Sequence, residues 1–408
     1  MRVGLFRPVA PEVIAVGYTF EHEIFERLLE RAPTSKHEFV VFEDLDGDKA
    51  TGKTPNLKET PRKRPFSAKQ LYAKLRSILE LRTRFPDRPI DGKNEWISNS
   101  LVRERIDFFV NVSPEIATLD VPFLVIVWDL QHRLQPFFPE VGSGDEWQRR
   151  ENFFSQVLKR AAYVVTGTDA GKKEVQMFYG IPDERIRILP HPTPRFALED
   201  GVKNTSMLAQ FRLPPNYIFY PAQFWSHKNH VGILRAILHL KEKENLRLPV
   251  VFTGSNQGNE SYIRQLVQTL QLDDQVFFLG HVSRPALRAL YQNAFVLCYS
   301  SFLGPLNLPP LEAFALGCPV IAADIPGSKE QFGDAAILVN PADHLQIAYA
   351  LRWLFSDNAK REELIRRGRE RAGRFTGKDF AKGLLDLLDE FEPIRRCWSA
   401  DSQDLLRS

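Results

Sequence analysis

Short apolar runs alternate with amphipathic segments along the chain, and the apolar runs fall into two series. The first series of predicted strands covers residues 2–6, 38–42, 106–112, 123–127, 163–166 and 186–189. The second covers residues 217–220, 250–253, 276–279, 294–299, 319–322 and 336–339. Short apolar strands separated by helical segments are typical of parallel sheets with crossover helices. The pattern therefore predicts an α/β protein with two doubly wound domains.

A proline-rich stretch separates the two series and is expected to link the domains. Residues 190–195 read Pro-His-Pro-Thr-Pro-Arg, a composition that suits neither a helix nor a central strand. We expect a first domain over residues 1–192, a second over 193–378, and a final amphipathic helix within 379–408. Ligands of such sheets bind beyond the carboxyl ends of the strands, so the cleft between the domains is the expected site.

Composition narrows the class of protein. The 408 residues are 43% hydrophobic, enough for two cores, and 54 basic residues against 51 acidic ones give a net charge of +3. Because the charges nearly balance, the molecule as a whole has no strong positive potential that would attract nucleic acid. Only three cysteines occur, which predicts a reducing cytosol. No leader pattern and no run of 18 apolar residues is found, so neither secretion nor membrane spanning is expected.

Residues 51–88 differ from the rest of the chain in carrying 11 lysines and arginines against three acidic residues. An apolar stripe at helical spacing runs through them, formed by Leu71, Leu75, Ile78 and Leu79. Two interpretations stay open. The segment is either a basic helix that meets a lipid headgroup or a lipid-diphosphate acceptor, or a plain solvated helix after an irregular loop.

One predicted helix has the features of a ligand site. Asn307 is a suitable N-cap, Pro309 and Pro310 have a preset φ, and Gly317 is a natural C-cap, so the helix should run from about Pro309 to Leu316. Its free amides and positive dipole end suit a diphosphate. Glu312, expected in the first turn, would suit sugar or ribose hydroxyls instead.

Lys228 is the leading candidate for a phosphate ligand, because it follows the strand predicted over 217–220. An ammonium at that place can neutralise a leaving diphosphate without a metal. We therefore expect neither a metal nor another cofactor.

The segment from Leu308 to Ala322 resembles the nucleotide-sugar-binding signature of retaining glycosyltransferases of family 4, which have the GT-B fold. Residues 220–230, 251–255, 276–282 and 326–341 are similar to further motifs of this family. The resemblance implies two Rossmann-like domains facing each other across a cleft, with the final helix returning to the first domain. It also implies donor-binding roles for Gly17, Gln223, Lys228, Gly254, Gly304, Leu306, Asn307, Leu308, Glu312 and Glu330.

The activity that the resemblance implies is transfer of a sugar, in the manner of a mannosyltransferase, with retention of anomeric configuration. The donor would be a UDP- or GDP-sugar, and the acceptor a hydroxyl of a glycan or lipid-linked molecule in polysaccharide or lipopolysaccharide biosynthesis. Nucleic acid is not an expected partner. The expected location is the cytoplasm. A peripheral contact with the inner face of the membrane, through residues 51–88, stays an open alternative.

The chain departs from the family at one position. Members usually have two glutamates eight positions apart, and Gly304 stands where the first should be. In one account, backbone amides around Gly304 and Leu306, together with Asn307, take over the sugar contacts. In the other, transfer activity has been lost.

In the first domain the candidates follow the strand predicted over 123–127. Relatives often carry His-Asp there, whereas this chain has Trp128 before Asp129 and a histidine at 132. Asp129 or His132 would take the polar role, so the expected catalytic set is Lys228, Asp129 and His132. Trp128 and His132 are the expected acceptor residues, with Trp128 alternatively part of the core. His191 is expected as a hinge residue and not as a ligand.

Two other classes of function stay open at this point. The chain could be a non-catalytic GT-B protein that binds a nucleotide or glycan, which would bind without turnover. It could also be a sugar-nucleotide epimerase, which would convert its donor without any acceptor.

Overall fold

The first half of the chain builds a seven-stranded parallel sheet in the order β3-β2-β1-β4-β5-β6-β7. The computed structural model describes residues 1–7, 16–43, 57–61, 99–112, 121–199, 206–304 and 307–398. Both faces of this sheet are covered, because Phe39 and Val41 join one core cluster while Val40 and Phe42 join another. The strands are β1 (Arg2–Phe6), β2 (Glu38–Glu43), β3 (Leu57–Pro61), β4 (Phe108–Asn111), β5 (Phe123–Ile126), β6 (Tyr163–Thr166) and β7 (Ile186–Ile188).

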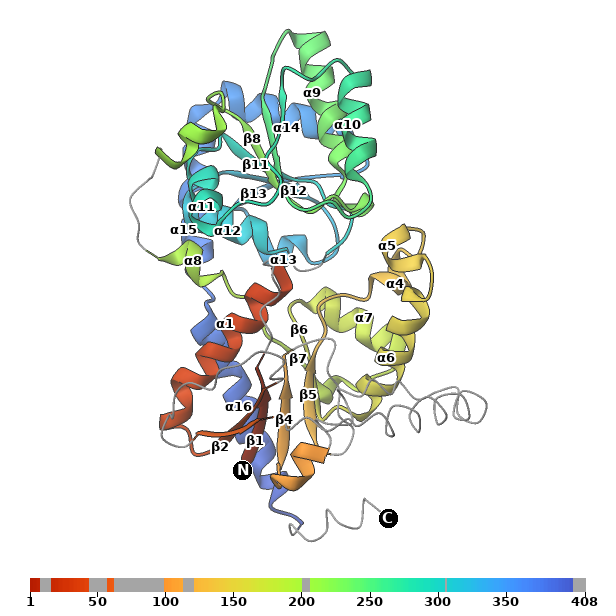
Figure 1. Ribbon diagram of the computed structural model, residues 1–408, viewed down its shortest axis with the longest axis vertical. Coiled ribbons are helices and arrows are strands. Elements are labelled where there is room, and N and C mark those ends of the chain that lie inside the picture. Colours follow the sequence, from red (N-terminus) through yellow and green to blue (C-terminus); the bar gives the residue numbers. More distant parts are fainter. Residues whose placement is uncertain are drawn as a thin grey trace, which may run out of the picture.

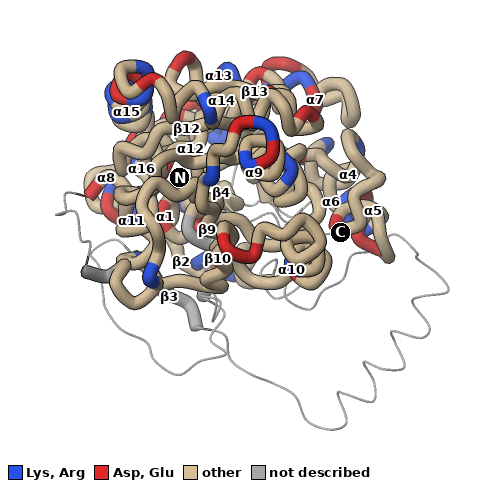
Figure 2. The backbone as a smooth tube through the Cα atoms, turned by 90° about the horizontal axis from the view of Figure 1, so that it is seen from above, with Lys and Arg blue, Asp and Glu red and all other residues tan. Residues whose placement is uncertain are grey.

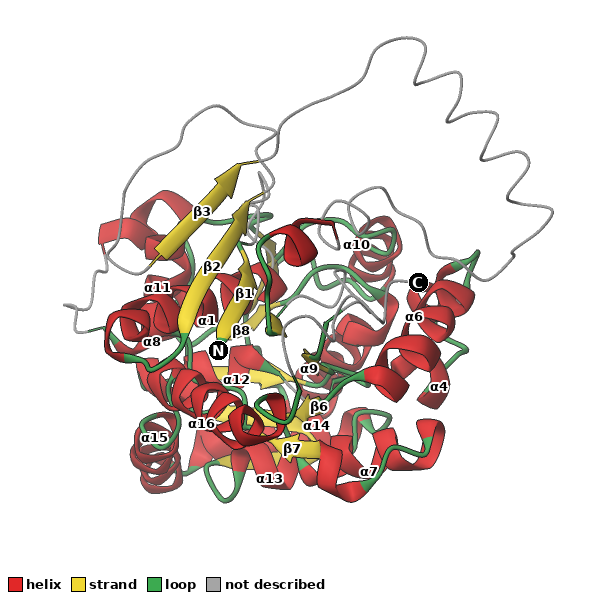
Figure 3. Cartoon of the chain, turned by 90° about the horizontal axis from the view of Figure 1, so that it is seen from below, coloured by secondary structure: helices red, strands yellow, loops and turns green. Residues whose placement is uncertain are grey.

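Helices flank this sheet, and Figure 3 shows β3, β2 and β1 side by side at one edge. Both ends of α7 are capped. Thr168 Oγ1 accepts a hydrogen bond from the amide of Gly171 at the start, and Gly180 adopts φ 63° at the end. The helical segments of this domain are α1 (Val16–Arg31), η1 (Ala32–Thr34), α4 (Gln131–Leu134), α5 (Pro139–Gly142), α6 (Glu146–Arg160), α7 (Asp169–Tyr179) and η2 (Asp183–Arg185).

The second domain is a six-stranded parallel sheet in the order β10-β9-β8-β11-β12-β13. The order reverses between β8 and β11, which makes their carboxyl ends the natural place for a ligand. The strands are β8 (Ile218–Pro221), β9 (Val250–Thr253), β10 (Val276–Phe278), β11 (Val296–Tyr299), β12 (Val320–Ala323) and β13 (Ala336–Val339). The helical segments are α8 (Arg195–Leu198), η3 (Ser206–Phe211), η4 (Ser226–Lys228), α9 (His230–Glu244), α10 (Glu260–Thr269), α11 (Arg284–Asn293), α12 (Leu308–Leu316), α13 (Ser328–Phe332), α14 (His344–Ser356) and α15 (Asn358–Ala372).

The chain crosses between the domains twice, and the two crossings lie together. Thr193 on the way out and Thr376 on the way back form an isolated parallel bridge, and the Thr193 amide donates to the carbonyl of Phe375 at 3.1 Å. After the second crossing, α16 (Gly377–Arg395) packs along α1, as Figure 1 shows. Its last residue, Arg395, pairs with Asp107 of the first domain at 2.7 Å.

The predicted α/β architecture with two doubly wound domains is confirmed, and each predicted strand occurs within about two residues of its expected bounds. Strand β3 was not predicted, because it lies in the basic segment and its sequence, Leu-Lys-Glu-Thr-Pro, has no apolar run. The apolar stripe of residues 71–79 lies outside the described residues. In Figure 2, acidic and basic residues are interspersed along α7 and α15, in keeping with the small net charge. Within the described ranges, none of the helices has the length and apolar character needed to span a bilayer.

Candidate active site

A cavity of about 490 Å³ lies between the two domains, at the carboxyl ends of both sheets. The first domain and the linker contribute Phe20, Trp128, Asp129 and His191 to its lining. The second domain contributes the segments that follow β8, β9 and β11, together with the start of α12. The cavity therefore stands where the fold predicts a ligand.

Lys228 is the one lysine or arginine among the described residues that line this cavity. It ends the short helix η4, and its Nζ lies 3.0 Å from the hydroxyl of Tyr299 and 5.3 Å from the centre of that ring. No carboxylate among the described residues forms an ion pair with it. An ammonium in this arrangement, held against a phenol hydroxyl, has the chemistry to bind an anion.

The loop before α12 is shaped by Gly304 and Asn307. Gly304 has φ +113°, and its carbonyl accepts a hydrogen bond from the Asn307 side-chain amide at 2.8 Å. Gln331 of α13 holds the Asn307 backbone on both sides, accepting from its N–H at 3.1 Å and donating to its carbonyl at 3.0 Å. Gly304, Asn307 and Leu308 all line the cavity. Leu306, also expected there, lies outside the described residues.

Helix α12 starts at Leu308 with Asn307 in the N-cap position and ends at Gly317, which has φ 73°. Asn307 does not cap the helix through its side chain, which bonds Gly304 instead. The two prolines occupy the second and third positions and have no N–H, and the Leu311 amide makes the first intrahelical bond, so Leu308 is the helix residue that keeps a free amide in the opening turn. The helix end therefore offers an anion fewer amides than the sequence analysis assumed.

Glu312 does not lie in the first turn of α12, because the helix begins one residue earlier than expected. It is four residues after Leu308 and so faces the same side of the helix. Its carboxylate is buried and accepts a hydrogen bond from the Tyr291 hydroxyl at 2.6 Å. Burial raises the pKa of Glu312 to about 7, although the hydrogen bond from Tyr291 acts in the opposite direction.

Gln223 and Gly254 shape the wall between β8 and β9. Gln223 donates to Ser255 Oγ at 3.1 Å and accepts from Trp225 Nε1 at 3.0 Å. Gly254 has φ +140°, and a Cβ there would lie 2.3 Å from the carbonyl oxygen of Ala222. Both residues line the cavity, and Gly254 is a glycine because the two loops touch at this point.

Glu330 lies outside the cavity lining and reaches the first domain. Its two carboxylate oxygens accept the amides of Asp169 at 2.6 Å and Ala170 at 3.1 Å, at the start of α7. A second contact between domains joins Glu140 of α5 to His227, whose backbone N–H donates to the carboxylate at 2.8 Å and whose Nδ1 contacts the same oxygen. These carboxylates hold the two domains together beside the cavity.

Asp129 lines the cavity but is already neutralised. It accepts from Arg150 Nη1 at 2.8 Å and from the amide of Gln131 at 3.0 Å. Burial opposes its ionisation, yet the Arg150 guanidinium holds the pKa of this carboxyl below its usual value. A carboxylate in this state is a weak proton acceptor, so Asp129 is poorly suited to act as a general base.

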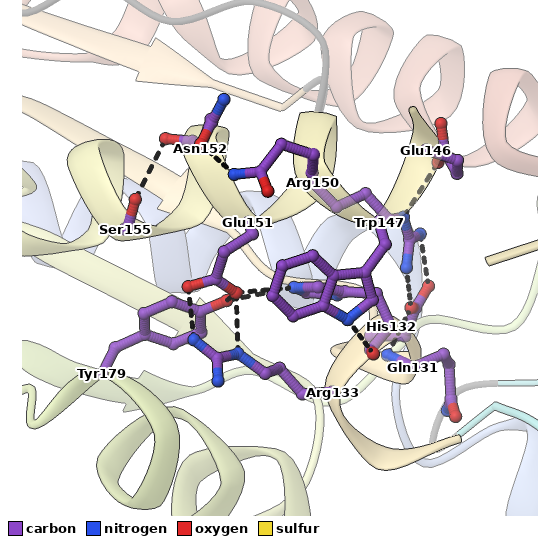
Figure 4. Close-up of polar contacts among 12 residues, drawn as sticks. Gln131, His132, Arg133, Glu146, Trp147, Arg150, Glu151, Asn152, Ser155 and Tyr179 are labelled. Atoms are coloured by element: carbon purple, nitrogen blue, oxygen red, sulfur yellow. Dashed lines mark hydrogen bonds and ion pairs between the residues drawn. The ribbon is translucent and has the colours of Figure 1, made fainter. Parts of the chain in front are cut away.

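His132 is fully buried outside the cavity, at the start of α4. Its Nε2 lies 3.1 Å from the Tyr179 hydroxyl, and Figure 4 shows His132, Tyr179 and Arg133 converging on Glu151. Trp147 Nε1 donates to the His132 carbonyl at 2.7 Å. The sequence could not show this, because these partners lie on α6 and α7, and the short turn of α4 carries the side chain away from the cleft.

Trp128 and His191 form part of the first-domain side of the cavity. Trp128 lines the cavity, as expected for an acceptor residue, and its ring meets Phe20 edge to face at 5.8 Å. His191, expected as a hinge, also lines the cavity and stacks on Phe20 at 4.6 Å. Its place directly after the last strand of the first sheet was the signal that could have identified it. Gly17 lies in the first turn of α1.

Comparison with known proteins gives a family for the second domain. Residues 208–371 match the family model of group 1 glycosyl transferases. The chain is 30% identical over 186 residues to the O-antigen chain mannosyltransferase RfbU of Salmonella typhimurium, covering 46% of this chain and 49% of that one. It is 28% identical over 239 residues to the D-inositol 3-phosphate glycosyltransferase of Pseudarthrobacter chlorophenolicus, covering 57% of each. The chain thus matches about half the length of these curated relatives.

Solved structures share the fold over nearly the whole chain. Sucrose-phosphate synthase from Thermosynechococcus elongatus superposes with a TM-score of 0.70 at 17% identity, over 96% of this chain and 99% of that one. The Anabaena protein HepE, solved in complex with UDP, gives a TM-score of 0.65 at 13% identity, over 95% and 99%. The two facing parallel-sheet domains are a GT-B fold, and residues 208–371 within it are similar to the group 1 glycosyl transferases.

Proposed function

We propose that this chain transfers a hexose from a nucleotide-sugar to a hydroxyl of a glycan or lipid-linked acceptor, with retention of configuration. The observation that carries the proposal is Lys228, whose ammonium lies in the cavity between the domains with no carboxylate partner among the residues that the structure describes. The mannosyltransferase name of the Salmonella relative supports a mannosyl donor, and the UDP complex of HepE supports a nucleoside diphosphate. O-antigen or other polysaccharide assembly is the setting that we propose.

In the proposed reaction, the bond between the sugar carbon and the diphosphate oxygen breaks while the acceptor oxygen bonds to the same face of the sugar. Lys228 offsets the charge that develops on the leaving diphosphate, assisted by the amide of Leu308. Because Asp129 is paired with Arg150, the leaving phosphate oxygen is the better acceptor for the proton of the attacking hydroxyl. We further propose that Lys228 makes a metal unnecessary.

The test measures binding and turnover separately. Wild-type protein is titrated calorimetrically with UDP- and GDP-sugars, and transfer is followed with the donor that binds, with and without EDTA. We expect one donor class to bind, and Lys228→Ala to weaken binding by about 2 kcal/mol, the size of a hydrogen bond to a charged group. Lys243→Ala is the matched control, because Lys243 is an exposed lysine of α9. Failure of every nucleotide-sugar to bind would refute the proposal.

A non-catalytic role is the second candidate, and Gly304 favours it, because no carboxylate stands at this point of the cavity wall. Donor binding that depends on Lys228, without transfer to any glycan acceptor, would support this role. Conversion of the donor in the absence of an acceptor would instead indicate an epimerase.

We also propose a peripheral contact with the inner face of the membrane through the basic residues 51–88. Most of this segment lies outside the described residues, so the support comes from its charge alone. Co-sedimentation with anionic vesicles, in low and high salt, tests the contact.

A further inference from the structure

We propose that Glu140 of the first domain is a positioning residue for Lys228, and that it acts through His227. This inference rests on the proposed function and deepens it, because it makes the anion site of the second domain depend on a side chain of the first. Among the described residues, the cavity lining includes His227 and Lys228 but not Glu140. An effect of Glu140 on a ligand must therefore pass through η4, the turn that ends with Lys228.

The turn η4 depends on its neighbours for its position. It is a helical turn of only three residues, and a turn of that length is not stable by itself. Within the second domain, the His227 carbonyl accepts a hydrogen bond from the Phe302 amide at 2.9 Å. The Nζ of Lys228 lies 3.0 Å from the hydroxyl of Tyr299, the last residue of β11. The turn is thus tied to β11 and the loop that follows it, where the strand order reverses.

The first domain reaches this turn with one carboxylate. The His227 N–H donates to Glu140 Oε1 at 2.8 Å, and His227 Nδ1 contacts the same oxygen. The side chain of Glu140 is 6% exposed and that of His227 is 13% exposed, so both contacts are shielded from water. Burial opposes ionisation of Glu140, but the hydrogen bonds from His227 hold the pKa of this carboxyl below its usual value. Because an ionised carboxylate can only accept, Nδ1 carries a proton and donates.

Two further contacts bring the same part of the first domain against the loop after β11. The ring of Phe138 lies 5.8 Å from that of Phe302 and 6.3 Å from that of His227, measured between ring centres. Gln135 Nε2 donates to the Phe302 carbonyl at 3.3 Å. The segment that contains α4 and α5 therefore contacts both parts of the second domain that hold Lys228 in place.

This arrangement connects the closure of the domains to the anion site. When the domains separate, His227 loses the acceptor for two of its N–H groups, and the loop after β11 loses the ring of Phe138. The turn is then held from the second domain alone. A lysine on a more mobile turn loses more conformational entropy when it binds an anion, so binding weakens although no direct contact with the ligand is removed.

The first measurement that tests this role needs no ligand. Hydrogen exchange of the full chain is followed by NMR at the amides of Lys228 and Phe302, which donate to the carbonyls of Trp225 and His227 and not to Glu140. Glu140→Ala should speed exchange at both amides by roughly three- to tenfold, the loss of about one hydrogen bond.

Two variants make this result specific. Glu140→Gln should restore most of the wild-type exchange rate, because an amide oxygen can accept both bonds from His227. Glu184→Ala is the matched control, since Glu184 is an exposed glutamate of η2 in the first domain, and it should leave both rates unchanged.

The second measurement asks whether the effect passes through Lys228. UDP and GDP are titrated calorimetrically into the wild type, Glu140→Ala, Lys228→Ala and the double variant. Glu140→Ala should weaken binding of whichever nucleotide binds by roughly three- to tenfold, and by less than about twofold once residue 228 is alanine. A carboxylate that only held the domains together would weaken binding equally in both backgrounds.

The outcomes separate this inference from the proposed function. Unchanged exchange in Glu140→Ala, no recovery in Glu140→Gln, or equal losses of affinity with and without Lys228 would overturn the inference. Failure of the wild type to bind any nucleotide or nucleotide-sugar would refute the proposed function, and the exchange rates would still decide whether Glu140 positions the turn. Nucleotide binding with the expected pattern but without sugar transfer would refute the transferase activity and leave the positioning role standing.

Discussion

Gly304 shows how one residue can fix the shape of a cavity wall. Its φ of +113° is a backbone conformation that side chains rarely adopt, and a Cβ added there would lie 2.7 Å from Asn307 Oδ1. The glutamate that the family resemblance leads one to expect at this position is therefore incompatible with the loop as folded. Asn307 takes the space instead, with its Nδ2 committed to the Gly304 carbonyl.

We predict that Gly304→Ala lowers the free energy of unfolding by about 1–3 kcal/mol, the cost of a strained backbone conformation plus the contact with Asn307. Thermal or urea unfolding measures the change. Gly258→Ala is the control for strain alone, because Gly258 has φ +97° and no atom within 4 Å of its added Cβ. If Gly304→Ala costs no more than the control, the Asn307 contact does not constrain this position.

A second prediction at this scale concerns the buried carboxyl of Glu312. Its pKa in the folded chain is about 7, against an ordinary value of 4.5, so the unfolded chain ionises first as the pH rises. The folded state should therefore lose stability between about pH 4.5 and pH 7, by up to about 3 kcal/mol, with no further change above that range. Glu312→Gln should remove this part of the pH dependence.

Urea unfolding at several pH values between 5 and 8 checks this prediction. Glu242→Gln, at an exposed position of α9, is the comparison, and its pH profile should match the wild type. A Glu312→Gln profile that falls as steeply as the wild-type one would mean that another group carries the effect.

At the scale of elements, the short helix α13 connects domain contact to cavity shape. Glu330 reaches across to the start of α7, and the next residue, Gln331, holds the backbone of Asn307. Arg371 of α15 also holds α13, because its Nε donates a hydrogen bond to the Gln331 carbonyl at 3.0 Å. Separation of the domains should therefore shift α13, and with it the backbone of Asn307 in the cavity wall.

We predict that Glu330→Ala favours the open arrangement of the domains, because it removes a carboxylate from the positive end of α7. A loss of about 1 kcal/mol would raise the ratio of open to closed molecules about fivefold. Small-angle scattering of the free protein should show a larger radius of gyration, and donor affinity should fall although Glu330 does not line the cavity. Glu242→Ala should change neither quantity, and an unchanged radius in Glu330→Ala would contradict the prediction.

The elements also show where prediction from sequence succeeds and where it stops. Strands such as Val250–Thr253 and Ala336–Val339 were found at their expected bounds, since a buried parallel strand is an apolar run between turns. The positions of Lys228, Asn307 and Trp128 followed from their places after strands. His132 and Glu330 could not be placed in the same way, because their partners, Tyr179 and the start of α7, come from distant segments.

At the scale of the whole molecule, α16 ties the end of the described chain to the first domain. Phe391 packs against Phe108 of β4 at 4.8 Å, and Arg395 makes two contacts to Asp107 at 2.7 and 2.8 Å. Arg395 is only 8% exposed, so this pair is largely shielded from water. Apolar residues of α16 thus pack on the first domain although they lie almost 300 positions later in the sequence.

We predict that Arg395→Ala destabilises the protein by about 1–3 kcal/mol, as expected for buried hydrogen bonds to a charged group. The neighbouring Arg396→Ala is the control: its side chain is 75% exposed and its ion pair with Glu392 should contribute about 1 kcal/mol or less. Differential scanning calorimetry compares the two. Equal effects would show that α16 is held by its apolar contacts alone.

The paired crossings at Thr193 and Thr376 limit how the molecule can open. Because the outgoing and returning segments are hydrogen-bonded to each other, we expect the two domains to rotate about this pair of segments more easily than they slide or twist. His191 lies in the linker, two residues before Thr193, and stacks on Phe20, whereas Glu330 and Glu140 join the domains through hydrogen bonds from other elements. A product would then leave when the domains separate on the side joined by Glu330 and Glu140, and the rate of this separation would set an upper limit on turnover.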